Sequence, residues 1–175
     1  MNLKDHIRTI PDFPKPGIMF RDVTTLFAHP DGFRETISRL VEIARVGRPD
    51  HIAGYDARGF VLAGAIAEKL GLGVTLLRKK GKLPGDTIFE EYELEYGTAA
   101  LEIHSDAVGP GQRVFLVDDL IATGGTGLAG VNLIRRLNAE VTGFAAVIDL
   151  PELGGADRIR SAGVEVEALV AFEGH

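Results

Sequence analysis

The stretch RVFLVDDLIATGGTG, Arg113–Gly127, decides the fold. Val114–Val117 is a continuous apolar run, typical of a strand that is buried on both faces of a parallel sheet. Two carboxylates, Asp118 and Asp119, end this run. A turn rich in glycine and threonine follows, and Thr126–Asn138 then has the periodicity of a helix. A strand, a tight turn and a helix in this order indicate an α/β fold.

The same alternation extends over most of the chain. Strands are predicted at Asp50–Tyr55, Gly73–Leu77, Thr87–Tyr92, Thr98–Ile103, Val141–Ile148 and Val164–Val170. Further helices are predicted at Asp31–Val46, with Asp31 as its N-cap and Gly47 at its end, at Gly59–Leu70 and at Pro151–Ser161. This order predicts a mostly parallel sheet flanked by helices. No linker divides the chain, so residues 1–175 are expected to form one domain.

Composition excludes several classes of protein. The 175 residues include no cysteine, which rules out disulfides, thiolate metal sites and a cysteine nucleophile. The formal charge of −6 argues against a surface that binds nucleic acid along the whole chain. The N-terminus has no apolar signal segment, and the run Phe60–Ala67 is far shorter than the roughly 20 residues that span a bilayer. We therefore expect a cytoplasmic protein without membrane contact.

The segment after the apolar run predicts a binding site for a phosphorylated sugar. Ligands of open α/β sheets bind outside the carboxyl ends of the strands. A helix that begins after small residues offers backbone N–H groups and a positive dipole end to a phosphate. Thr123 and Thr126 add hydroxyl groups. Adjacent Asp118 and Asp119 suit the hydroxyls of a sugar or a Mg²⁺ ion held largely through water.

This segment has three other interpretations. Gly125, Gly127 and Gly130 form a literal G-x-G-x-x-G, followed by Asp149, which mimics a dinucleotide fingerprint. In that fingerprint, however, the first glycine follows the strand directly. An apolar run ending in two aspartates also resembles a Walker B strand, but the chain has no P-loop motif. The third interpretation is two capping aspartates before an ordinary turn.

The motif Val114–Thr126, VFLVDDLIATGGT, resembles the site for 5-phosphoribosyl-1-diphosphate (PRPP) of the type I phosphoribosyltransferases. More of the chain resembles one branch of that family, the adenine phosphoribosyltransferases. The segments that carry this resemblance are Ile7–Asp22, Gly54–Phe60, Arg78–Thr87, Leu94–His104 and the terminal FEGH. The resemblance implies a mostly parallel twisted sheet with flanking helices. It also implies a small hood over the base, formed mainly by about residues 1–30.

The resemblance further implies an enzyme of purine salvage, a pentosyltransferase among the glycosyltransferases. It would transfer the 5-phosphoribosyl group of PRPP to N9 of adenine, giving AMP and diphosphate, with Mg²⁺ and as a homodimer. The histidines His6, His29, His51, His104 and His175 have no ligand spacing, so we expect no metal site in the protein and Mg²⁺ carried by PRPP.

The resemblance assigns site residues as follows. PRPP would be bound by Arg58, Arg78, Lys79, Lys82, Asp118, Asp119, Ala122, Thr123, Gly124, Gly125 and Thr126. Adenine would be bound by Met19, Phe20, Arg21 and Leu150, in part through main-chain groups. The catalytic residues would be Glu95, Tyr96, Arg58 and Lys82. The adjacent aspartates would hold the ribose hydroxyls, and residues 122–126 would surround the 5′-phosphate.

The assignment of the basic run has support from the residues themselves, whereas the assignment of Glu95 rests on the resemblance. The run Arg78–Lys82, RKKGK, concentrates positive charge in an acidic chain, and Gly81, Pro84 and Gly85 predict a loop that closes over phosphates. A solvated charge run is the ordinary alternative. Glu95 is one of five glutamates between Glu90 and Glu102, so only its LEYG context selects it as the group that handles the N7 proton.

Two other functions stay open. One is phosphoribosyl transfer to xanthine or orotate; the hypoxanthine–guanine relatives carry an acidic residue where Ala122 stands here. The other is a PRPP-sensing regulator that binds nucleic acid. The acidic balance and the absence of an appended DNA-binding segment count against that regulator.

Overall fold

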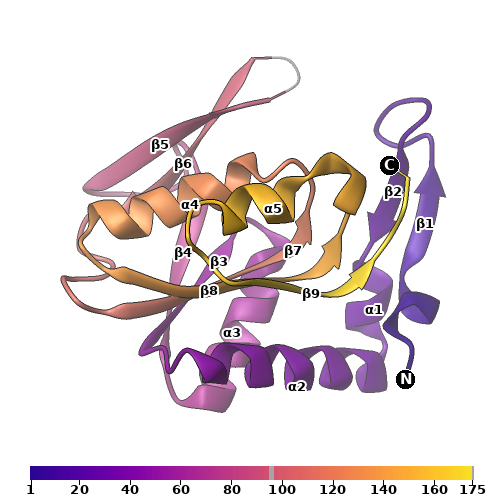
Figure 1. Ribbon diagram of the computed structural model, residues 1–175, viewed down its shortest axis with the longest axis horizontal. Coiled ribbons are helices and arrows are strands. Elements are labelled where there is room, and N and C mark those ends of the chain that lie inside the picture. Colours follow the sequence, from indigo (N-terminus) through magenta and orange to yellow (C-terminus); the bar gives the residue numbers. More distant parts are fainter. Residues whose placement is uncertain (95–96, 175) are drawn as a thin grey trace.

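The computed structural model describes residues 1–94 and 97–174, and Figure 1 shows a sheet between two layers of helices. The sheet has seven strands in the order β5-β6-β4-β3-β7-β8-β9. They are β3 (His51–Tyr55), β4 (Gly73–Lys79), β5 (Thr87–Glu93), β6 (Thr98–His104), β7 (Arg113–Ile121), β8 (Glu140–Asp149) and β9 (Val166–Ala171). Strands β4, β3, β7, β8 and β9 are parallel, and β6 and β5 continue one edge in antiparallel order.

Helices cover both faces of the parallel strands (Figure 1). One face carries α2 (Pro30–Val46) and α3 (Arg58–Leu70), and the other carries α4 (Gly125–Arg136) and α5 (Gly155–Arg160). Strand β7 explains this sandwich, because the side chains of Val114–Val117 are buried alternately in the two cores. The prediction of a mostly parallel sheet flanked by helices is confirmed. None of the described helices has the length and apolarity needed to cross a bilayer.

The N-terminal segment adds a hairpin that the sequence analysis did not divide into elements. Helical turn η1 (Leu3–His6) precedes β1 (Arg8–Pro11), and β2 (Met19–Asp22) leads into α1 (Thr24–Ala28). Strands β1 and β2 form a separate antiparallel sheet, called here the N-terminal hairpin (residues 8–22). Arg8 and Asp22 form an ion pair of 2.6 Å across it. Hydrogen bonding from Thr24, with a smaller contribution from Arg8, lowers the pKa of Asp22 to about 2.

Three predicted details were wrong. Asp31 is not the N-cap of α2; His29 takes that place, its Nδ1 accepting from the Gly32 amide at 2.9 Å. The predicted helix Pro151–Ser161 is divided into the turn η2 (Pro151–Leu153) and α5, because Gly154 between them has a φ of +75°. The loop predicted at Arg78–Lys82 begins only after Lys79, since β4 includes the first two residues of that run.

The glycines of α4 are explained by close packing. A Cβ on Gly127 would lie 2.6 Å from Cδ1 of Ile159, and one on Gly130 would lie 2.2 Å from the hydroxyl oxygen of Tyr55. Tyr55 is fully buried at the end of β3, and its hydroxyl donates to the carbonyl of Gly127 at 2.8 Å. The spacing that mimics a dinucleotide fingerprint therefore lets α4 approach the sheet closely.

We predict that Gly130→Ala destabilises the protein by about 1–3 kcal/mol, because the added methyl group overlaps the Tyr55 ring in a filled core. Urea unfolding measures the difference. Gly64→Ala is the matched control, since Gly64 is also helical and a Cβ there meets nothing within 4 Å. That control should be neutral or stabilise by up to about 1 kcal/mol. Equal stability of the two variants would contradict this account of the packing.

Candidate active site

A cavity of about 420 Å³ opens at the carboxyl ends of the parallel strands, within the range of small-ligand sites. Most of the predicted site residues line it together. From the PRPP set these are Arg58, Lys79, Asp118, Asp119, Ala122, Thr123, Gly124, Gly125 and Thr126; from the adenine set they are Met19, Phe20, Arg21 and Leu150. Arg78 and Lys82 are described but are not part of this lining, and Glu95 and Tyr96 lie outside the described residues.

The two adjacent carboxylates have different surroundings. Asp119 is buried, and its Oδ2 accepts from Arg58 Nε at 2.5 Å. Asp118 is half-buried, and its Oδ1 accepts from the Asp119 amide at 2.8 Å. Burial, followed by the negative charge of Asp119, raises the pKa of Asp118 well above its ordinary value. The chain thus holds a carboxyl group that is costly to ionise at the wall of the cavity.

The turn after β7 exposes the first amides of α4. Gly124 precedes that helix with a φ of +89°, a conformation that favours glycine. A Cβ on Gly124 would lie 2.8 Å from the carbonyl oxygen of Gly155, and one on Gly155 would lie 2.3 Å from that of Ala122. The turn therefore rests directly on the start of α5. No side chain in the described part of the chain caps α4, so its N-terminal N–H groups and dipole are available to an anion.

The basic residues at the end of β4 and in the turn after it are held in different ways. Arg78 Nε lies 3.1 Å from Asp56 Oδ2, and Lys79 lines the cavity. Lys82 is exposed in the turn that follows. Glu102 on β6 accepts from the Gly81 amide and, at 2.5 Å, from the Thr87 hydroxyl. The turn between β4 and β5 is thus tied to β6 rather than extended into solvent.

The N-terminal hairpin borders the opposite side of the cavity. Met19, Phe20 and Arg21 approach from β2, while Leu150 follows the last residue of β8. The residues predicted for the base and those predicted for the phosphate therefore line one cavity. The lining is apolar around Phe20 and Leu150, as expected for a planar ring, and charged around Arg58 and the aspartates.

The sequence analysis did not single out several lining residues. They include Asp56, Tyr92, Leu120, Ile121, Leu153 and Ile159. Asp56 stands inside the GYDARGF segment, next to the assigned Arg58, so its motif contained the signal. Tyr92 and Ile159 lie on elements distant in sequence, and no local pattern marks them. Across residues 1–94 and 97–174, no group of three or more metal-ligating side chains occurs.

The chain belongs to the phosphoribosyltransferase family, since residues 22–167 match the phosphoribosyl transferase domain. Curated relatives of this chain belong to one branch of that family, the adenine phosphoribosyltransferases. The adenine phosphoribosyltransferase of Methylorubrum extorquens (strain PA1) is 58% identical over 173 residues, covering 99% of this chain and 96% of the relative. The family resemblance stated from the motifs is therefore confirmed.

Solved structures of the same branch share the fold. Adenine phosphoribosyltransferase from Thermoanaerobacter pseudethanolicus has a TM-score of 0.92 and 44% identity, covering 97% of this chain and 98% of its own. The enzyme from Saccharomyces cerevisiae, complexed with an imino-altritol bisphosphate and adenine, has a TM-score of 0.89 and 35% identity, with 96% of both chains covered. The type I phosphoribosyltransferase fold is thus confirmed for this chain.

We predict that Asp118→Asn makes stability less dependent on pH. The raised pKa means that, above the ordinary aspartate value, folded Asp118 keeps a proton that the unfolded chain releases. Its contribution to stability therefore falls as pH rises through that window, and asparagine does not titrate. The free energy of unfolding should fall less for the variant than for the wild type between about pH 5 and about pH 8. Exposed Asp106→Asn is the control and should follow the wild type.

Proposed function

We propose that this protein is an adenine phosphoribosyltransferase of purine salvage, which converts adenine and PRPP to AMP and diphosphate. The observation that carries the proposal is the single cavity that joins three features. These are the N-terminus of α4, the carboxylates Asp118 and Asp119, and the edge of the N-terminal hairpin with Met19 and Phe20. The curated relatives at 58% identity are named for this activity, and the yeast relative was crystallised with adenine.

The site chemistry supports transfer at the anomeric carbon. In the reaction the bond from C1 to diphosphate breaks, the bond from N9 of adenine to C1 forms, and adenine loses one proton. We assign Asp118 and Asp119 to the ribose hydroxyls and residues 122–126 with the start of α4 to the 5′-phosphate. The carboxyl oxygens of Asp118 and Asp119 would interact more strongly with the ribose as positive charge develops on it, and this lowers the barrier, because only interactions stronger in the transition state raise the rate.

We assign the cations near the carboxylates to the leaving group. Arg58 and Lys79 line the cavity, and Asp119 holds the Arg58 guanidinium in place at 2.5 Å. A positioned guanidinium stabilises the charge that develops on departing diphosphate. Arg78 and Lys82 are proposed for the same anion when substrate is bound. The Asp56 ion pair orients the Arg78 side chain, whose Nε is 3.1 Å from Asp56 Oδ2.

Mg²⁺ is proposed as the cofactor, and its chemistry is to neutralise the diphosphate oxygens. The donor set fits a cation that arrives with PRPP, because the described residues offer the adjacent carboxylates Asp118 and Asp119 but no group of three or more ligating side chains. Mg²⁺ commonly keeps water and substrate phosphates as ligands and takes one or two carboxylates. Either aspartate would meet the cation through water.

Base selection is proposed at the N-terminal hairpin, which would form the hood. Adenine presents an amino donor and a ring-nitrogen acceptor, and the main chain of Met19 and Arg21 is proposed to pair with both. Phe20 and Leu150 would cover the faces of the purine. Ala122 leaves no acidic side chain in the phosphate loop, which fits the proposed preference for a 6-aminopurine.

We also propose a cytoplasmic homodimer that binds neither membrane nor nucleic acid. Val61, Val74 and Leu76 support the dimer, since these large apolar side chains of α3 and β4 are between 39% and 48% exposed. The formal charge of −6 supports the absence of nucleic-acid binding. The cysteine-free composition is compatible with a reducing compartment.

Incubation with PRPP, Mg²⁺ and a panel of bases tests the function. We expect AMP and diphosphate from adenine, with far lower product from hypoxanthine, guanine, xanthine and orotate, measured by chromatography. If a nucleotide formed only from xanthine or from orotate, that base and not adenine would be the substrate. No nucleotide from any base, together with salt-dependent binding of DNA or RNA, would favour the PRPP-sensing regulator.

We predict that Glu95→Gln lowers kcat for AMP formation by about 10²–10⁴-fold, because the proposed role of Glu95 is to handle the proton at N7 of the purine. Its effect on adenine affinity should be much smaller. Steady-state kinetics with direct adenine titration separates the two. Glu91→Gln, at an exposed position on β5, is the matched control and should retain activity. Normal turnover by Glu95→Gln would contradict the proposed role of Glu95 in handling the N7 proton.

A further inference from the structure

The N-terminal hairpin has no backbone ladder to the main sheet within the described residues, since β1 pairs only with β2. Its distance from the carboxyl end of β8 therefore depends on its chain connections to η1 and α1 and on side-chain contacts with the sheet. That distance matters because β2 brings Met19, Phe20 and Arg21 to the cavity, and Leu150 faces them from the sheet side. Whatever holds the hairpin against the sheet also sets the width of this end of the cavity.

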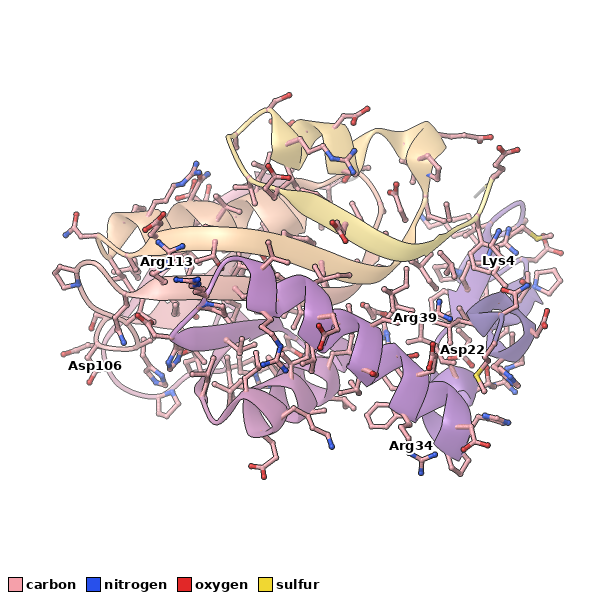
Figure 2. All side chains as sticks on the ribbon, turned by 60° about the horizontal axis from the view of Figure 1, so that its bottom comes forward. Lys4, Asp22, Arg34, Arg39, Asp106 and Arg113 are labelled. Atoms are coloured by element: carbon pink, nitrogen blue, oxygen red, sulfur yellow. The ribbon has the colours of Figure 1, made fainter. Side chains whose placement is uncertain are left out.

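Phe172, just after β9, occupies the junction. The Arg21 guanidinium carbon lies 4.5 Å from the centroid of the Phe172 ring, and Lys4 Nζ lies 4.7 Å from it. Figure 1 shows the C-terminus beside β2, and Figure 2 shows Lys4 next to the end of the last strand. The Phe172 amide donates to the carbonyl of Asp149 at 3.0 Å, one residue before Leu150. One residue thus joins the sheet edge of the cavity to its hairpin edge.

The Arg21 side chain has few other supports. Its Nη1 donates to the Thr9 hydroxyl at 2.7 Å, which is a contact inside the hairpin itself. Its Nε is buried and has no hydrogen-bond partner among residues 1–94 and 97–174. Among the described residues, the Phe172 ring thus ties the Arg21 guanidinium to a part of the chain outside the hairpin. Cation–π contacts of this kind become stronger when they are shielded from water.

We propose that Phe172 is a positioning residue for the base subsite, a C-terminal aromatic clamp that seats β2 through Arg21 and Lys4. The inference rests on the proposed function, in which the main chain of Arg21 pairs with the base. The Arg21 side chain contacts the Phe172 ring, and Arg21 also lines the cavity, so a displacement of this side chain is transmitted to that part of the cavity wall. The clamp should affect the binding of the base and not of PRPP. The proposed phosphate loop and the two aspartates belong to β7, α4 and the turn between them, and not to the hairpin.

The test is Phe172→Ala with separate titrations of both substrates. We expect the KM for adenine to rise roughly tenfold, the fold-change that corresponds to losing contacts of this strength. The KM for PRPP and kcat should change by less than about twofold. Phe172→Tyr keeps the ring and should restore the adenine KM. Phe172→Leu keeps apolar volume without a ring and should behave like the alanine variant.

Phe33→Ala is the control for general loosening. Phe33 lies on α2, packs against Phe27 with ring centroids 5.6 Å apart, and is not part of the cavity lining. It should lower stability without changing the adenine KM selectively. An equal rise in both KM values for Phe172→Ala, or full restoration by leucine, would overturn the clamp.

Hydrogen exchange of the amides in residues 8–22 gives a readout without substrate. Exchange there should be faster in Phe172→Ala than in the wild type and normal in Phe172→Tyr, while β7 keeps its protection. Unchanged exchange in the hairpin would also overturn the proposal. If the wild type made no AMP, the proposed function would fail, and the exchange experiment would still decide whether Phe172 seats the hairpin.

Discussion

Burial of β7 on both faces is the constraint on which the rest of the structure depends. Its apolar residues hold the two helical layers together, with Val114 and Leu116 in one core and Phe115 and Val117 in the other. The strand then ends in a cavity rather than in solvent. Asp118 and Asp119 are consequently partly removed from water, and the guanidinium of Arg58 compensates one of them. The position of the two aspartates and their partial burial both follow from the course of β7.

The main sheet could be predicted from sequence because its signals are local. The β7 run, the strand–turn–helix order and the glycine turn all act over a few residues, and the structure places the predicted phosphate loop at the cavity. The boundaries were less certain: β7 continues to Ile121, and β4 takes in Arg78 and Lys79. In both cases strand pairing extends a segment beyond the point where composition alone suggests a turn.

The remaining features depend on contacts between distant segments. The N-terminal hairpin has strands of only four residues each, too short for a clear period of two. Gly130 opposes Tyr55 from far along the chain, and Phe172 meets Lys4 and Arg21 near the opposite terminus. No local pattern reports such pairs. The resemblance assigns Arg21 to the proposed base site, but its contact with Phe172 required three-dimensional coordinates.

The separation of the hairpin from the main sheet has an evolutionary consequence. The parts proposed to hold ribose and phosphate belong to the central sheet and α4, where a substitution disturbs the folding core. The proposed base-reading part belongs to a small attachment held by side chains. Selection can therefore alter the accepted base through the hairpin and its aromatic support, while the common phosphoribosyl chemistry and the stability of the scaffold stay intact.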